Sequence, residues 1–243
     1  MYMGNIAAFF DIDGTIARES LMIEHFKRLI KYEILDESVW VDDVKQLYME
    51  YVNRYGAYDA YIEALSEKYR SDLRGFDIRY NKFIAEQSIK KVFERVYVFS
   101  RNQLEFHKAN GHLIFFISGS PDFLVKEMAE KYDVTEFRAT KYLFDENGKF
   151  TGEIVPMWHS EGKDEVCNEI IEKYNIDVEK SYAYGDTTGD LSMLRRFGNA
   201  YTINPSNKLL QRIKNDEELS KKVNIIVERK DVIYKLKADV TTL

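Results

Sequence analysis

Two aspartates stand one residue apart at the end of a short apolar run near the start of the chain. Residues 5–10 are followed directly by Asp11-Ile12-Asp13-Gly14-Thr15. A short apolar run that ends in a turn signal is typical of a buried strand in a parallel sheet. Two carboxylates so close together repel each other unless they share a cation or a proton, and Mg²⁺ prefers oxygen ligands. The motif therefore predicts a metal site that also carries a nucleophile.

Further polar groups follow other expected strands. The apolar run 112–117 ends in Ser118-Gly119-Ser120-Pro121, and the short run 181–185 ends in Asp186-Thr187-Thr188-Gly189-Asp190. Lys163 opens a helical pattern between these two motifs. Open α/β sheets bind ligands beyond the carboxyl ends of their strands, so these side chains are expected to meet at one edge of the sheet.

This set of side chains suits one kind of chemistry. Phosphoryl transfer to an aspartate needs an attacking carboxylate, cations that neutralise the phosphoryl oxygens, and hydroxyl and N–H donors that hold them. In chain order and spacing, the four motifs resemble those of the haloacid dehalogenase superfamily, most of whose members are phosphatases. The resemblance implies an aspartyl-phosphate mechanism.

The resemblance also implies roles for single residues. Asp11 would be the nucleophile, and Asp13 the acid that protonates the leaving group and later the base that activates water. Ser118 and the N–H of Gly119 would hold the phosphoryl group, and Lys163 would neutralise its charge.

The same resemblance implies a Mg²⁺ site. Asp186 would bind the ion together with Asp11 and the backbone carbonyl of Asp13. Asp190 would lie in or just behind the metal shell. The alternative for Asp190 is an acid at the start of a helix, where the helix dipole favours negative charge.

Within the superfamily, the sequence looks like a phosphatase of the phosphoserine phosphatase-like branch. The members that cleave carbon–halogen bonds lack the second aspartate, whereas this chain has Asp13. A helical module between the first two motifs is also typical of that branch. The chain departs from phosphoserine phosphatases at two places: Ser20 stands where they carry a glutamate, and Gly189 where they carry an asparagine. The resemblance therefore does not extend to phosphoserine as the substrate.

The loop that follows the first motif holds the candidates for substrate recognition. Arg18, Glu19 and Ser20 leave the catalytic loop and enter the helical module. Their alternative role is to cap the start of the next helix.

The hydrophobic pattern predicts how the chain is organised. It is helical from Thr15 to about residue 105 and alternates between strands and helices afterwards. We expect an α/β fold with a Rossmann-like parallel-sheet core formed by residues 1–17 and 106–243, and an inserted helical cap formed by residues 18–105. Within the core, residues 145–148 predict a hairpin turn, residues 208–223 one charged helix, and residues 225–227 the last strand.

Composition narrows the range of partners. A net charge of −6 offers no general attraction for nucleic acid, and no segment approaches the ~20 apolar residues that a membrane span needs. The single cysteine, Cys167, excludes an intramolecular disulfide and fits a buried helical position. Residues 1–5 lack the basic region of a signal peptide. These features favour a cytoplasmic protein.

The sequence therefore predicts a Mg²⁺-dependent phosphatase that acts on a small phosphorylated metabolite. Two alternatives stay open: a phosphotransferase or mutase of the same fold, and a catalytically silent regulatory or binding module. The identity of the substrate and the oligomeric state are not predicted.

Overall fold

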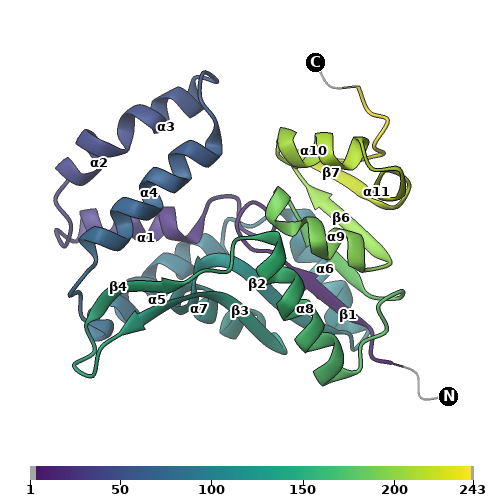
Figure 1. Cartoon of the computed structure of the whole chain (residues 1–243), viewed down its shortest axis with the longest axis horizontal. Coiled ribbons are helices and arrows are strands. Elements are labelled where there is room, and N and C mark those ends of the chain that lie inside the picture. The colour runs from purple at the N-terminus through teal and green to yellow at the C-terminus, as the bar shows by residue number, and fades with distance from the viewer. Residues whose placement is uncertain (1–3, 242–243) are drawn as a thin grey trace.

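A computed structural model describes residues 4–241, apart from the side chains at positions 42, 43 and 59. Residues 1–3, part of the segment judged not to be a signal peptide, lie outside the described residues. The centre of the fold is an eight-stranded sheet with the order β4-β3-β2-β1-β5-β6-β7-β8 (Figure 1). Its strands are β1 (Ala7–Phe10), β2 (Leu113–Pro121), β3 (Glu136–Phe144), β4 (Phe150–Val155), β5 (Tyr182–Gly185), β6 (Asn199–Ile203), β7 (Asn224–Arg229) and β8 (Val232–Leu236).

Most of this sheet is parallel. The strands from β3 to β7 in the sheet order pair in parallel, whereas β4 and β8 pair antiparallel at the two edges. The predicted α/β class with a mainly parallel sheet is therefore confirmed. The last strand was expected at residues 225–227. Instead, a turn at residues 230–231 is followed by one more strand, β8, which pairs antiparallel with β7.

The register of the central strands brings the motifs to one level. Phe10 of β1 pairs with Phe116 of β2 on one side and with Tyr184 of β5 on the other. Asp11, the next residue after β1, therefore lies near the carboxyl end of β5 and beside β2. Strand β2 continues through Ser118, with a register shift before Pro121.

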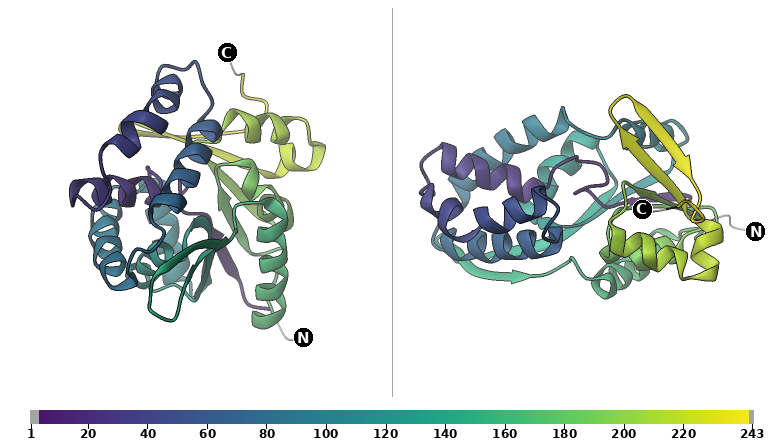
Figure 2. Two further views of the ribbon diagram at one scale, coloured as in Figure 1. Left: turned by 60° about the vertical axis from the view of Figure 1, so that its left-hand side comes forward. Right: turned by 90° about the horizontal axis from the view of Figure 1, so that it is seen from above.

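Helices cover both faces of the sheet (Figure 2). Alternate residues of β1 point to opposite faces, so Phe10 packs with α6 (Val98–Ala109) and α7 (Asp122–Tyr132), whereas Phe9 packs in the core on the other face. That second core contains Cys167, which is buried as predicted. The helices on that side are α8 (Ser160–Tyr174), α9 (Leu191–Arg196), α10 (Asn207–Lys214) and α11 (Glu217–Lys222).

Two helix boundaries differ from the prediction. Helix α8 begins at Ser160, so Lys163 lies in its first turn rather than at its start. Residues 208–223 form two helices instead of one, because the Asp216 side chain accepts hydrogen bonds from the N–H groups of Glu218 and Leu219 and begins α11. Such an N-cap starts a new helix where the pattern of apolar residues alone suggests continuity.

Five helices lie between β1 and α6 and pack around a core of their own. Glu24 and Lys91, 2.8 Å apart, link the first of these helices to the last. The module also pairs with the β3–β4 hairpin, because the N–H of Ile78 donates to the carbonyl of Gly148. The helices are α1 (Leu21–Lys31), α2 (Ser38–Asp43), α3 (Lys45–Val52), α4 (Tyr58–Asp72) and α5 (Ile78–Phe93).

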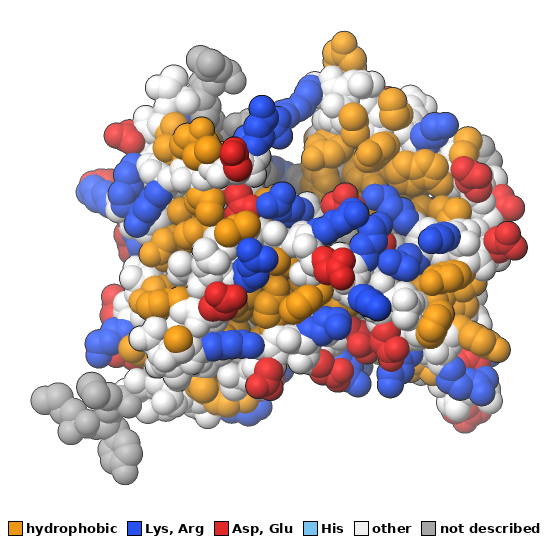
Figure 3. Space-filling model, turned by 180° about the vertical axis from the view of Figure 1, so that it is seen from behind, with side chains coloured by type: hydrophobic (Ala, Val, Ile, Leu, Met, Phe, Trp, Pro, Cys, Tyr) orange, Lys and Arg blue, Asp and Glu red, His pale blue; other side chains and the backbone are white. Residues whose placement is uncertain are grey.

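Part of this module presents apolar side chains to solvent. Seen from behind, hydrophobic side chains gather over the helices α2 to α4 (Figure 3). In this part of the chain, Val41, Met49, Val52 and Tyr55 are each more than a third exposed. Among the described helices, none combines the length and the apolar character that crossing a membrane requires.

Candidate active site

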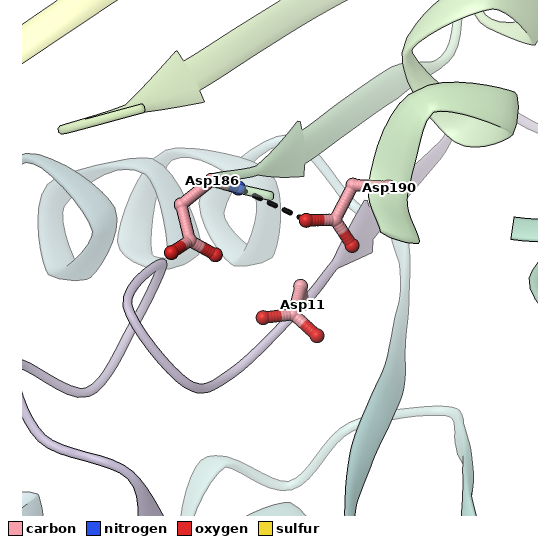
Figure 4. A group of neighbouring side chains, drawn as sticks. All are labelled: Asp11, Asp186 and Asp190. Atoms are coloured by element: carbon pink, nitrogen blue, oxygen red, sulfur yellow. Dashed lines mark hydrogen bonds between the residues drawn. The ribbon is translucent and has the colours of Figure 1, made fainter. Parts of the chain in front are cut away.

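Three carboxylates converge beyond the ends of β1 and β5. Asp11 follows β1, Asp186 follows β5, and Asp190 ends the short 3₁₀ turn Thr188–Asp190. One oxygen from each lies within 4.8 Å of the others. Figure 4 shows the three side chains together. Lys163 reaches into the group from α8, and its Nζ donates to Asp11 Oδ1 and to Asp190 Oδ1, both at 2.7 Å. The structure thus brings together four residues from three segments that are far apart in the sequence.

The cluster places three carboxyl groups around one ammonium group in a largely buried site. Burial raises the pKa of Asp11 to about 8, although the Lys163 ammonium acts in the opposite direction. Burial and the charge of Asp11 raise the pKa of Asp186 well above its usual value. Burial opposes the charged form of Lys163, but the charges of Asp11 and Asp190 outweigh burial and raise its pKa. When ionised, these carboxylates carry more negative charge than one lysine neutralises, and such a group is a suitable set of ligands for a hard divalent cation.

Asp190 has a structural role as well as a place in this cluster. Its Oδ2 accepts hydrogen bonds from the N–H groups of Asp186 and Thr187, both at 3.0 Å. It thereby fixes the loop that presents the Asp186 carboxylate. Its other oxygen accepts from Lys163, so the two interpretations of Asp190 are compatible.

Asp13 turns its carboxylate toward donors rather than toward the three acids. It accepts from Ser120 Oγ at 2.5 Å, from the N–H of Leu21 at 2.8 Å and from Ser20 Oγ at 3.2 Å. Burial raises the pKa of the Asp13 carboxyl, and these hydrogen bonds reduce the rise. Ser20 therefore contacts a proposed catalytic group.

Ser118 and Gly119 lie on β2 directly before Ser120, the residue that contacts Asp13. Ser118 Oγ accepts from the N–H of Ser120 at 3.2 Å, and the Gly119 carbonyl accepts from Thr140 Oγ1 at 2.7 Å. A Cβ at position 119 would lie 2.9 Å from Trp158 Cβ. The segment that carries Trp158, between β4 and α8, therefore packs directly on this part of the site.

Trp158 also gives a physical reason for Gly189. A Cβ at position 189 would lie only 2.7 Å from the Trp158 carbonyl oxygen. Side chains do not reach that distance without displacing the backbone opposite. The asparagine that phosphoserine phosphatases carry here would therefore require the Trp158 segment to move.

Arg18 and Glu19 contact residues outside the acidic cluster. The Arg18 guanidinium lies 2.6 Å from Glu228 and over the ring of Tyr97. Glu19 pairs with Lys27 at 3.2 Å, and both side chains are more than half exposed.

Two residues of the site were not singled out from the sequence. Ser120 makes the shortest contact to Asp13, and Thr15 Oγ1 donates to Asp186 Oδ1 at 3.2 Å. Thr15 lies within the first motif, so its place in the sequence could have identified it as a residue of the site. Ser120 lies where β2 shifts register. The amino-acid sequence alone does not show whether Ser118 or Ser120 points toward Asp13.

The fold and the site define an α/β enzyme with a cluster of carboxylates and one lysine at the carboxyl edge of a parallel sheet. A family model for haloacid dehalogenase-like hydrolases matches residues 8–195. The chain therefore belongs to this family, which confirms the predictions of the family and of a phosphatase-type enzyme.

Individual relatives agree with this assignment. A probable phosphatase of Mycobacterium tuberculosis is 26% identical over 84% of this chain and 70% of its own length. The phosphoserine phosphatase SerB1 of the same species is 23% identical over 84% of this chain and 66% of its own. A solved phosphoserine phosphatase with bound substrate shares the fold, with a TM-score of 0.61 and 20% identity over 95% of this chain and 96% of its own.

Proposed function

We propose that the protein is a Mg²⁺-dependent phosphatase that hydrolyses a small phosphomonoester through an aspartyl-phosphate on Asp11. The observation that supports this most is the contact of Lys163 with both Asp11 and Asp190 beside the Asp186 carboxylate. An ammonium at 2.7 Å favours the ionised form of Asp11, which is the form that attacks phosphorus. Ser118 Oγ and the Gly119 N–H would hold the phosphoryl oxygens.

The oxygen donors and the unbalanced charge of the cluster fit Mg²⁺. Asp11, Asp186 and the Asp13 carbonyl would hold the ion, with Asp190 behind them. When bound, the ion would neutralise charge on the transferring phosphoryl group. It would also favour the ionised carboxylates that burial opposes.

In the first step, a carboxylate oxygen of Asp11 would bond to phosphorus while the bond from phosphorus to the leaving oxygen breaks. The Asp13 carboxyl would give its proton to that oxygen, which releases an alcohol. In the second step, water would attack phosphorus, the bond to Asp11 would break, and Asp13 would take the proton of the water. Burial of Asp13 raises its pKa and so helps it to carry a proton at the first step.

We propose that the helices α1 to α5, within residues 18–105, act as a cap over this site. Tyr58, the first residue of α4, supports this role: burial, and after it the charges of Asp13 and Asp186, raise the pKa of its hydroxyl. A cap excludes bulk water and restricts the size of the substrate.

Hydrolysis of an aryl phosphate tests the proposal. We expect turnover that requires Mg²⁺, stops with EDTA, and falls at least about a thousandfold in Asp11→Asn, since the nucleophile is lost. Asp231→Asn, an exposed aspartate in the β7–β8 turn, is the control and should keep full activity. Equal activity of Asp11→Asn and the wild-type protein would exclude the mechanism, and product formed only with an added alcohol would indicate a phosphotransferase.

A further inference from the structure

The two segments that join the helical module to the sheet pair with each other. The N–H of Tyr97 donates to the Ile16 carbonyl at 2.9 Å, and Ala17 and Val96 form an antiparallel bridge. We call residues 16–20 the incoming linker and residues 94–97 the outgoing linker. Because the two linkers form a short ribbon, a displacement of one moves the other.

Glu228, near the carboxyl end of β7, contacts the incoming linker and the first turn of the helix that follows the outgoing linker. Its Oε1 accepts from Arg18 Nη2 at 2.6 Å, and its Oε2 accepts from the N–H of Phe99 at 3.0 Å. Phe99 lies in the first turn of α6, directly after the outgoing linker, and the N-cap residue of α6 makes no side-chain cap. Glu228 thus accepts a hydrogen bond from an N–H group in the first turn of α6. Its negative charge also interacts favourably with the positive end of the helix dipole.

Glu228 is itself fixed to the sheet. Its N–H donates to Asn204 Oδ1 at 2.9 Å, and the N–H of Asn204 donates to the Ile226 carbonyl at 2.7 Å. Only 4% of its side chain is exposed. A buried carboxylate with charged and backbone donors on both oxygens has little freedom to change its rotamer.

We propose that Glu228 is a positioning residue that locks the incoming and outgoing linkers to the sheet and so holds the partners of Asp13 in place. Arg18 lies two residues before Ser20, and both Ser20 and Leu21 donate to the Asp13 carboxylate. A shift of the incoming linker therefore moves two of the three donors on Asp13. In this arrangement Arg18 acts through Glu228 and not by contact with the substrate. The kinetic part of this inference rests on the proposed phosphatase function.

The experiment compares Glu228→Gln, Arg18→Met and the double variant with the wild-type protein. Amide hydrogen exchange of residues 16–20 and 94–99, which cover both linkers and the first residues of α6, is measured together with kcat and KM on an aryl phosphate. Arg195→Met is the matched control, because Arg195 pairs with Asp216 at 2.8 Å and is 55% exposed, compared with 45% for Arg18. Urea denaturation shows whether each variant is folded.

We expect both linkers to exchange at least about tenfold faster in the two single variants, and kcat to fall about tenfold, since small displacements of catalytic groups are costly. The double variant should lose no more than either single variant, because the two residues act as a unit. Arg195→Met should match the wild-type protein in both measurements.

Unchanged exchange of the linkers in Glu228→Gln and Arg18→Met would overturn the proposal, whatever the activity. An increase of KM in Arg18→Met with normal kinetics in Glu228→Gln would also overturn it, since that pattern indicates direct contact of Arg18 with the substrate. If the wild-type protein hydrolyses no phosphomonoester, the proposed function fails, whereas faster linker exchange in the variants would still support the locking role of Glu228.

Discussion

At the scale of residues, Asp13 depends on donors from segments that are distant in the chain. Ser120 Oγ, 107 positions away, lies 2.5 Å from its carboxylate, whereas Ser20 and Leu21 approach from the start of the helical module. An acid that must both give and take a proton needs a fixed direction, and three donors on one carboxylate provide it. Asp13 therefore accepts hydrogen bonds both from the sheet and from the start of the helical module.

Ser120→Ala tests this dependence. We expect kcat for an aryl phosphate to fall about tenfold, because Asp13 loses its shortest hydrogen bond. Proton transfer by Asp13 is expected to contribute more than about tenfold to the rate, so a partial loss of its orientation has this effect. Ser88→Ala is the control, since Ser88 is also buried and its Oγ donates to the Ile84 carbonyl within α5. A Ser120→Ala enzyme as fast as the control would show that Asp13 is oriented without Ser120.

At the scale of elements, the segment between β4 and α8 shapes the site although it contributes none of the proposed catalytic groups. The backbone of Trp158 lies so close to Gly189 that a Cβ there would be 2.7 Å from its carbonyl oxygen. We expect Gly189→Ala to destabilise the fold by about 1–3 kcal/mol, the usual cost of overpacking, and to lower activity through the adjacent Asp190. Urea denaturation and the aryl phosphate assay measure the two effects.

Gly162→Ala gives the matched comparison. A Cβ at Gly162 would meet only Met157 Sδ, at 3.9 Å, and the residue lies within α8. Alanine should therefore be neutral there or stabilise the helix by up to about 1 kcal/mol. The same small effect at both positions would mean that the Trp158 segment gives way easily.

The elements also show what a sequence can and cannot reveal. The strands β1, β2 and β5 were predictable because each is a local apolar run. The carboxyl ends of β1 and β5 bring Asp11 and Asp186 to one edge of the sheet, where Lys163 of α8 meets them. The Trp158 segment and Glu228 were not predictable, because their importance lies in contacts with distant residues. Strand β8 was missed because most of its residues are exposed and show no alternating pattern.

At the scale of the whole molecule, a buried chain of hydrogen bonds joins α6 to the central strands. His107 of α6 bonds through Nε2 to the Tyr184 hydroxyl of β5 and through Nδ1 to His112, both at 2.8 Å. The Tyr184 hydroxyl donates to Gln103 at 3.0 Å, so it must accept from His107 Nε2–H. Burial favours the neutral form of His107, and in that form its Nδ1 accepts a hydrogen bond from His112.

The preference of buried His107 for its neutral form predicts how stability depends on pH. Burial, and after it the neighbouring His112, lowers the pKa of His107 to about 3, compared with about 6.5 in the unfolded chain. Between these values the unfolded chain binds the proton more readily, so acidification through this range favours unfolding. From pH 7 to pH 5 the contribution of His107 to the free energy of unfolding should fall by about 1–2 kcal/mol.

Urea denaturation at pH 7, 6 and 5 measures this dependence in the wild-type protein and in His107→Gln. Glutamine keeps an N–H donor for Tyr184 but has no proton to gain, so the variant should lose about 1–2 kcal/mol less on acidification. Other titrating groups, such as the buried His25, are common to both proteins and cancel in the difference. His159→Gln, at the exposed start of α8, should behave like the wild-type protein. If His107→Gln loses stability on acidification as steeply as the wild-type protein, then His107 does not limit acid stability.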